Sequence, residues 1–376
     1  MKHLLSHLHH HLPHDLGLLE QMVNMDSPSL DKALIDRFVH FVGKQFEDIG
    51  GAVDYIPAEK SGDHLRVFFP GGTMRPILLL GHTDTVFSAG EAARRPFAVR
   101  DGRAAGPGVF DMKAGILLML SALRALLAVD GGLRRPVVVL LTSDEEVGSP
   151  SSRTIIESEG KRAEAVLVLE PSLPGGVLKT ARKGVGTFTI QALGRAAHAG
   201  VDPLKGINAI EEIAHQVLAL RRLAEATPEA TVTAGVIRGG TRTNVVPAEA
   251  MVEVDVRVAT LEQAEQITQG IRSLRPHLPG SRLEIRGGVN RPPMERTSAT
   301  ERLFTLAQSI AREMALPLQE GSTGGASDGN FTAAMGIPTL DGLGAVGDGA
   351  HSLDEFVEIE SLPSRAALVA GLIQRV

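Results

Sequence analysis

Three short runs of apolar residues constrain the fold of this chain more than any other feature. They are Pro76–Leu80, Pro136–Leu141 and Ala165–Leu169, and none of them alternates with polar residues. Continuous apolar runs of this length are typical of strands that are buried on both faces. Helical patterns lie between and around the runs, so the alternation predicts an α/β layer with a mixed, mostly parallel sheet flanked by helices.

The helical patterns of this layer include one that is almost entirely apolar. Helices are expected at Leu16–Asn24 and Leu30–Ile49, and a buried core helix at Ala114–Val129. The last of these is too short for a membrane span and carries Arg124, so a place in the core is the better interpretation.

The first fourteen residues are rich in histidine. We expect this segment to be a disordered polar tail, although it could also bind a metal loosely. It holds six histidines in fourteen residues: His3, His7, His9, His10, His11 and His14.

The order of expected helices and strands changes between residues 184 and 290. The order there is βαββαβ, which is typical of a ferredoxin-like α+β unit. Its expected elements are Thr187–Leu193, Ile207–Leu223, Thr231–Ile237, Ala250–Val258, Leu261–Leu274 and Arg282–Arg286. After residue 290 the α/β pattern of the first part of the chain returns, with a helix expected at Thr300–Met314. A chain of 376 residues exceeds the size of most single cores. We therefore predict one domain from residues 1–183 and 291–376, with residues 184–290 inserted as a second.

Composition excludes several classes of function. The net charge is −6 and no Lys/Arg block stands out, so nucleic acid and membrane are poor partners. The chain has no cysteine, which excludes disulfides, thiolate metal sites and a thiol nucleophile. No signal peptide is seen, so a cytoplasmic location is expected, although the absence of cysteine does not fix the compartment and export stays open.

Polar residues follow each of the three apolar runs. His82 and Asp84 follow the first run, Glu145 and Glu146 the second, and Glu170 the third. In open α/β sheets ligands bind beyond the carboxyl ends of the strands, so these side chains should converge on one crevice. An acidic run such as "TSDEEVGS" is more often a solvated loop, but several carboxylates at one sheet edge repel each other unless cations compensate them.

Two further residues extend this set. Asp111 precedes the apolar helix in "GPGVFDMKAG", and His351 lies in "GDGAHSLDE". Each of these residues, considered alone, has a structural explanation: Asp111 could cap a helix, Glu170 could be a charged loop residue, and His351 could be a surface histidine. Together, two histidines and the carboxylates are enough to bind two divalent metals.

The motifs "GHTDTV", "GPGVFDMK", "DEEVGS", "EPS" and "HS" resemble, in order and spacing, the co-catalytic zinc peptidase family. That family includes glutamate carboxypeptidase, aminoacylase, succinyl-diaminopimelate desuccinylase and acetylornithine deacetylase. The resemblance covers nearly the whole chain, and the inserted unit is similar to the family's lid and dimerisation domain. The stretches "DEEVGSPSSR" and "ARKG" are most similar to the glutamate carboxypeptidase branch.

The resemblance implies two Zn²⁺ per subunit, with Co²⁺ or Mn²⁺ able to substitute. Asp111 would bridge the metals, Glu146 and His351 would complete one site, and His82 and Glu170 the other. Asp84 would accept the second ring N–H of His82. Glu145 would be the general base. The peptide bond between Asp111 and Met112 is cis in the family and is expected to be cis here.

The resemblance also assigns residues in the inserted domain. His198 would reach the active site of a partner subunit and stabilise the developing oxyanion, which implies a homodimer through residues 184–290. Asn244 and Arg257 would bind the substrate. Arg257 would pair with the terminal carboxylate of the substrate. Lys183 and the loop around Asp328 are weaker candidates. A solvated lysine and a helix cap are the alternatives for Lys183 and Asp328.

The expected function is a two-zinc hydrolase acting on a small peptide or N-acyl amino acid. Release of a C-terminal amino acid, with glutamate favoured, is the first interpretation. Deacylation or desuccinylation of N-acyl amino acids at the same two-metal site is the second, because the choice of acyl group depends on the shape of the pocket. The third interpretation is that the chain is a member of the family without catalytic activity. The intact ligand set and the presence of Glu145 argue against it.

Overall fold

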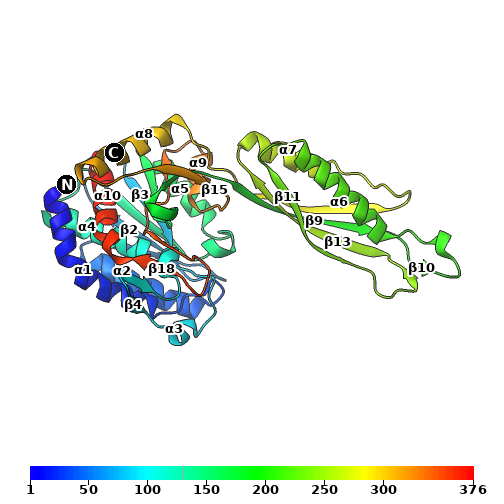
Figure 1. Cartoon of the computed structure of the whole chain (residues 1–376), viewed down its shortest axis with the longest axis horizontal. Coiled ribbons are helices and arrows are strands. Elements are labelled where there is room, and N and C mark those ends of the chain that lie inside the picture. The colour runs from blue at the N-terminus through cyan, green and yellow to red at the C-terminus, as the bar shows by residue number, and fades with distance from the viewer. Residues whose placement is uncertain (130) are drawn as a thin grey trace. The chain divides into compact units, whose positions relative to one another are not determined.

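The computed structural model describes residues 1–129 and 131–376. By its internal contacts the chain divides into two compact units, each described here by itself. Unit 1 comprises Met1–Ala181, Arg296–Ser322 and Ser327–Val376. Unit 2 comprises Arg182–Glu295 and Thr323–Ala326. The second unit is therefore an insertion in the chain of the first (Figure 1).

The three apolar runs form the centre of the main sheet of unit 1, as predicted. They are β3 (Ile77–His82), β6 (Val137–Thr142) and β7 (Ala165–Val168), and every residue of the three strands is buried. β3 lies between the other two and runs parallel to both. A short strand, β16 (Thr339–Leu340), extends the sheet in parallel beside β7. Parallel pairing brings the carboxyl ends of these strands to one edge.

The strands beyond β6 pair in antiparallel fashion. The three apolar runs do not predict these strands. The full order is β1-β2-β6-β3-β7-β16, in which β2 (His64–Phe69) pairs antiparallel with β6, and β1 (Ala52–Ile56) with β2. Smaller sheets complete the unit. One is β17-β18-β5-β4 and the other pairs β15 with β8. Their bounds are β4 Ala98–Arg100, β5 Arg103–Ala105, β8 Leu178–Arg182, β15 Glu320–Thr323, β17 Gly347–Asp348 and β18 Phe356–Glu358.

Helices surround this sheet, and α2 packs against β1 and β2. Asp31 caps α2 by accepting a hydrogen bond from the amide of Leu34. The helices of unit 1 are α1 Lys2–Val23, α2 Lys32–Asp48, α3 Glu91–Arg94, α4 Ala114–Val129, α5 Arg153–Arg162, α8 Ser298–Glu313, α9 Gly329–Ala334 and α10 Leu362–Arg375.

The prediction of a disordered leader is wrong, because the histidine-rich segment is part of α1 (Figure 1). Apolar residues at helical spacing, such as Leu4, Leu8 and Leu19, are buried on one face of α1, which packs against α4 and α10. The buried side chain of Asp15 accepts hydrogen bonds from Ser121 and Arg124. Tertiary packing therefore orders a segment whose composition alone favours disorder.

The apolar helix α4 is the buried core helix that the sequence predicts. Within the described ranges, residues Val109–Val129 form one helical stretch long and apolar enough to cross a membrane, with a mean hydropathy of 1.8. However, 78% of its most apolar part is buried inside the protein. A core helix of a folded domain meets the same criteria, so this stretch is weak grounds for a membrane span.

Unit 2 has the predicted βαββαβ order. Its sheet runs β11-β13-β9-β14 with every pair antiparallel, and α6 and α7 cover one face (Figure 1). Burial alternates along β13, so one of its faces packs on the helices and the other does not. The bounds are β9 Gly184–Leu193, β10 Ala197–His198, α6 Ala209–Glu225, β11 Thr231–Gly239, β12 Val245–Val246, β13 Glu249–Val258, α7 Leu261–Arg272 and β14 Arg282–Arg291.

Candidate metal centre

The residues after the three parallel strands meet at one edge of the sheet in unit 1. His82 is the last residue of β3, directly opposite Thr142 at the end of β6. A short turn, η2 (Glu145–Val147), follows β6, and Glu170 follows β7 by two residues. The strand register alone therefore places these side chains next to one another.

Asp111 lies between the two histidines of the set. Its Oδ1 atom is 3.1 Å from Nε2 of His82, and its Oδ2 atom is 3.1 Å from Nε2 of His351. A second carboxylate accompanies each histidine: Glu170 Oε1 is 3.4 Å from His82 Nε2, and Glu146 Oε2 is 3.2 Å from His351 Nε2. The five residues thus form two groups that share Asp111.

This donor set fits divalent metal ions. Ligand atoms of His82, Asp111 and Glu146 all lie within 4.8 Å of one another. Nitrogen and oxygen ligands at about 2.0–2.2 Å from a tetrahedral Zn²⁺ are roughly 3.3–3.6 Å apart, close to the spacing seen within each group. One oxygen of Glu146, Oε1, is buried with no hydrogen-bond partner among the described residues.

The electrostatics of the cluster favour positive charge. Hydrogen bonds to Asp111 and Glu146 raise the pKa of His351 to about 11. Burial acts to lower the pKa of His82, but Asp111, Asp84 and Glu170 outweigh it and hold that pKa well above its usual value. Burial raises the pKa of Glu146, because its charged form is poorly solvated there. A bound cation would satisfy all of these groups together.

Asp84 orients both His82 and the turn that carries the paired glutamates. The main-chain carbonyl of Asp84 lies 2.9 Å from Nδ1 of His82, nearer than the Asp84 carboxylate at 3.5 Å. A carbonyl can only accept, so Nδ1 donates to it, and Nε2 is the nitrogen that faces the cluster and that would bind a metal in the neutral ring. The Asp84 carboxylate also accepts the main-chain amides of Glu145, at 3.2 Å, and Glu146, at 3.1 Å.

The loop that presents Asp111 is held by two residues that the sequence reasoning missed. The peptide bond between Asp111 and Met112 is cis, as the resemblance implies. The buried carboxylate of Glu355 accepts the main-chain amides of Gly108, Phe110 and Asp111 at 2.8–2.9 Å. Burial raises the pKa of Glu355 to about 7, against the lowering effect of these three donors. The only sequence signal was its place four residues after His351.

Lys113 supports the same loop from the other side. Its buried ammonium group donates to the main-chain carbonyls of Met25, at 2.8 Å, and Pro107, at 3.1 Å. Burial lowers the pKa of Lys113 to about 8. Two main-chain acceptors compensate part of the cost of burying this charge.

Asp144, the first of the three consecutive acids, has a structural role that the sequence reasoning also missed. Its carboxylate is fully buried and accepts from Ser151 (main-chain amide at 2.7 Å, hydroxyl at 2.6 Å) and from the hydroxyl of Ser152, at 2.5 Å. The serines of "GSPSS" were the available signal. The carboxylates of Asp144 and Glu146 therefore occupy different environments.

Asp328 does not act as a helix cap, so that alternative is wrong. It precedes α9, but its side chain makes no capping hydrogen bond. Instead the carboxylate accepts from the hydroxyls of Thr142, at 2.8 Å, and Ser149. It ties the end of β6 to the loop that follows the η2 turn.

Of the candidates in unit 2, two lie side by side. His198 is exposed on β10, opposite Val245 of β12, and the main-chain carbonyl of Asn244 accepts from the amide of Ala199 at 3.0 Å. Nδ1 of His198 accepts the amides of Gly200, at 3.1 Å, and Val201, at 3.2 Å. Nδ1 is therefore unprotonated in the neutral ring, and Nε2–H is left as an outward donor.

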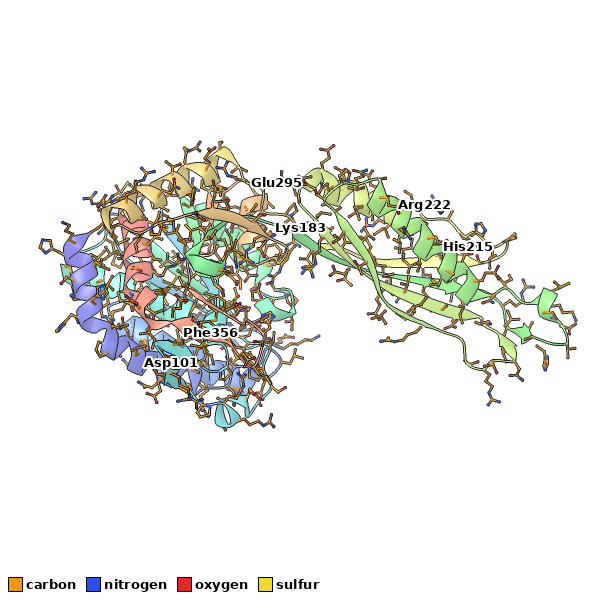
Figure 2. The ribbon with its side chains drawn as sticks, in the orientation of Figure 1. Asp101, Lys183, His215, Arg222, Glu295 and Phe356 are labelled. Atoms are coloured by element: carbon orange, nitrogen blue, oxygen red, sulfur yellow. The ribbon has the colours of Figure 1, made fainter. Side chains whose placement is uncertain are left out.

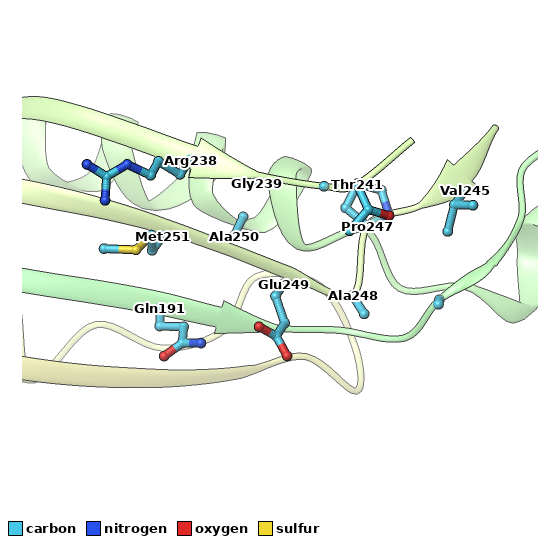
Figure 3. Close-up of a pocket in the computed structure, with 12 residues that line it drawn as sticks. Gln191, Arg238, Gly239, Thr241, Val245, Pro247, Ala248, Glu249, Ala250 and Met251 are labelled. Atoms are coloured by element: carbon cyan, nitrogen blue, oxygen red, sulfur yellow. The ribbon is translucent and has the colours of Figure 1, made fainter. Parts of the chain in front are cut away.

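A cavity of about 500 Å³ adjoins this strand pair (Figure 3). Its walls include Arg238 and Met251, on the sheet face opposite the helices, and Val245 and Pro247 near the β12 strand. None of the five residues of the metal cluster lines it. The cavity is thus a feature of unit 2 alone.

The other two candidates in unit 2 have partners of their own. The guanidinium of Arg257 donates to both carboxylate oxygens of Asp255, at 2.9 and 3.0 Å, and to the carbonyl of Gly324 at 3.3 Å. Lys183 (Figure 2) is half-buried and donates to the main-chain carbonyl of Glu229 at 2.6 Å, so it is not a freely solvated lysine.

Comparison with known proteins gives a consistent picture. The family model described as Peptidase family M20/M25/M40 matches residues 78–375. Carboxypeptidase G2 of Pseudomonas sp. (strain RS-16) is 30% identical over 370 residues, which cover 96% of this chain and 89% of that protein. A succinyl-diaminopimelate desuccinylase of Acidovorax ebreus (strain TPSY) is 29% identical over 311 residues, 77% of this chain and 78% of the other.

A solved structure supports the fold. The aminopeptidase PepT of Bacillus cereus ATCC 10987 superposes with a TM-score of 0.78 at 22% sequence identity, covering 96% of this chain and 98% of the other. At this identity the likeness concerns the fold alone.

Proposed function

The chain belongs to Peptidase family M20/M25/M40, and we propose that it is a two-metal carboxypeptidase that releases a C-terminal amino acid, preferably glutamate. Members of this family are metal-dependent hydrolases, and the names of its relatives are those of enzymes that cleave amide bonds. The observation that carries the two-metal proposal is the position of Asp111, whose two carboxylate oxygens each face a different histidine.

In this proposal His82 and Glu170 would hold one ion, Glu146 and His351 would hold the other, and Asp111 would be a ligand shared by both. Two divalent ions, when bound, supply Lewis acidity toward the scissile carbonyl and lower the pKa of water. Glu145 takes the proton of the attacking water and passes it to the leaving nitrogen. Asp84 fixes Glu145 in position through the main-chain amide of that residue. The outward Nε2–H of His198 is suited to donate to the developing oxyanion.

A deacylase acting on N-acyl amino acids is the second candidate. The desuccinylase relative supports it, because that enzyme matches this chain at 29% identity. The longer match, at 30% identity over 96% of the chain, is to a carboxypeptidase and favours the first candidate. Both reactions would use the same ligand set and the same base.

A substrate panel separates these candidates. The purified enzyme is assayed on N-acyl glutamates, dipeptides, acetylornithine and succinyl-diaminopimelate. We expect the highest kcat/KM for substrates that release glutamate, because the carboxypeptidase relative spans nearly the whole chain. A higher kcat/KM for acetylornithine or succinyl-diaminopimelate would assign the deacylase function instead.

Arg257→Lys should weaken the recognition of a substrate's terminal carboxylate. A planar guanidinium binds a carboxylate through two parallel hydrogen bonds, which an ammonium group cannot reproduce. Loss of one charge-assisted hydrogen bond, worth about 1.5–3 kcal/mol, should lower kcat/KM for free-acid substrates roughly 10- to 150-fold and leave the corresponding amides nearly unchanged.

Asp255→Asn is the matched control, because Asp255 holds the Arg257 guanidinium in this structure. Removing that competing charge should preserve or strengthen the preference for free acids. An unchanged preference in Arg257→Lys would mean that another residue, such as Lys183, holds the carboxylate.

We also propose that the enzyme is a homodimer through residues 184–290 and that His198 acts on the partner's active site. β11 is an edge strand of unit 2, with mostly exposed residues, so a second copy can pair with it. His198→Ala and Glu145→Ala homodimers should each be nearly inactive.

Co-expression of these two variants tests the proposal. Random pairing makes about half of the dimers mixed, and each mixed dimer has one site with an intact Glu145 and the partner's His198. Roughly a quarter of wild-type activity should return. If mixed dimers are demonstrated by mass spectrometry and no activity returns, His198 acts within its own subunit or plays no part in the reaction.

A further inference from the structure

We propose that His7, His10 and His11 of α1 form a second metal site, for a divalent transition-metal ion such as Zn²⁺, Ni²⁺ or Cu²⁺. The three positions are related by three and four residues, so their side chains are neighbours on one side of the helix. The ring centroids of His7 and His11 are 4.1 Å apart, and those of His10 and His11 are 5.4 Å apart. Two histidines four residues apart on a helix are a known arrangement for holding Zn²⁺.

The hydrogen bonding of His11 prepares it to bind a metal. Its Nδ1 atom lies 2.9 Å from the main-chain carbonyl of His7. Because a carbonyl only accepts, Nδ1 must carry the proton of the neutral ring, and Nε2 presents a lone pair. Histidines that ligate metals usually have their second ring nitrogen fixed in this way.

His7 contributes an independent observation. Its Nε2 atom is buried and has no hydrogen-bond partner among the described residues. A buried polar atom without a partner is unfavourable, and such atoms in folded proteins call for an explanation, a bound ion being one. The His7 and His11 rings are stacked, with an angle of 28° between their planes, so both rings must turn to direct a nitrogen at one ion, which would then satisfy this atom.

The surrounding charges permit a cation at this place. The positive group of Arg124 lies 3.4 Å from Nδ1 of His14, and its guanidinium is bound to the buried carboxylate of Asp15. We therefore leave His14 out of the ligand set. Imidazole ligands favour Zn²⁺, Ni²⁺ and Cu²⁺ over Mg²⁺ or Ca²⁺, which defines the class of ion. The site lies wholly on α1 and shares no residue with the Asp111 cluster.

Metal content after equilibrium dialysis against Zn²⁺ tests this site. Wild-type protein should hold one equivalent per chain more than the double variant His7→Ala/His11→Ala. Alanine is the best helix former, so the double variant should keep α1 folded. His9→Ala is the matched control, because His9 is exposed and lies on the other side of α1, and it should keep the full metal content.

Two further measurements keep the result unambiguous. Hydrolytic activity should be the same in all three proteins, since α1 holds none of the proposed catalytic residues. His11→Gln, which keeps a polar side chain of similar size, should also lose the extra equivalent. Equal metal content in wild-type and double-variant protein would overturn the proposal, and so would loss of the same equivalent in His9→Ala.

Discussion

Exhaustive removal of divalent metal should abolish hydrolysis by this protein, and Zn²⁺, Mn²⁺ or Co²⁺ should restore it. This is the expected result because two carboxylates and two histidines meet around the carboxylate of Asp111. Without cations, the carboxylates of this buried cluster repel one another, and neither the water nor the scissile carbonyl is activated. Activity and elemental metal content should fall together and return together.

Metal removal should also lower stability. A ligand present at a thousand times its dissociation constant adds about 4 kcal/mol to the free energy of unfolding. Thermal unfolding with and without metal measures this contribution. The His7→Ala/His11→Ala variant is the control that separates the two proposed sites, since it should show the same loss and recovery of hydrolysis. Full turnover by protein proven to be metal-free would contradict the two-metal proposal.

Much of the fold follows from the sequence because local patterns and global structure agree. The apolar runs at β3, β6 and β7 are typical of strands covered on both faces, and their parallel pairing brings His82 and Glu146 together. The alternation along β13 likewise predicts a sheet with one covered face. In the first case an unbroken apolar run predicts the burial of the strand, and in the second an alternation with a period of two does so.

The parts that the sequence does not predict depend on long-range partners. The position of Asp111 relies on Glu355, whose carboxylate binds main-chain amides almost 250 residues away in the chain. The order of α1 depends on packing against α4 and α10 rather than on its histidine-rich composition. No local pattern reports such contacts.

The acidic run shows the same limit at single-residue scale. Asp144, Glu145 and Glu146 have equal charge and adjacent positions, and the Asp144 carboxylate accepts two serine hydroxyls at 2.5–2.6 Å. Glu146 faces His351, and Asp84 holds the main-chain amides of both glutamates. A substitution that removes only the charge can therefore show which glutamate does which task.

Glu145→Gln should lower kcat by about 10²–10⁴-fold and leave about two metal ions in the centre, because it removes a general base without removing a ligand. Glu146→Gln should lose metal as well, since Oε2 of Glu146 lies 3.2 Å from the ring nitrogen of His351 and the neutral amide is a poor ligand. The two variants are matched, with the same chemical change at neighbouring residues of one turn whose amides Asp84 holds.

Kinetics and elemental analysis of the same preparations decide the assignment. Glu164→Gln, an exposed glutamate beyond α5, controls for the loss of one surface charge and should behave as wild type. Excess Zn²⁺ should partly restore Glu146→Gln, whose base is intact, and should not restore Glu145→Gln. If Glu145→Gln loses its metals while Glu146→Gln keeps them, the roles of the two glutamates are reversed, and the base is the residue that faces His351.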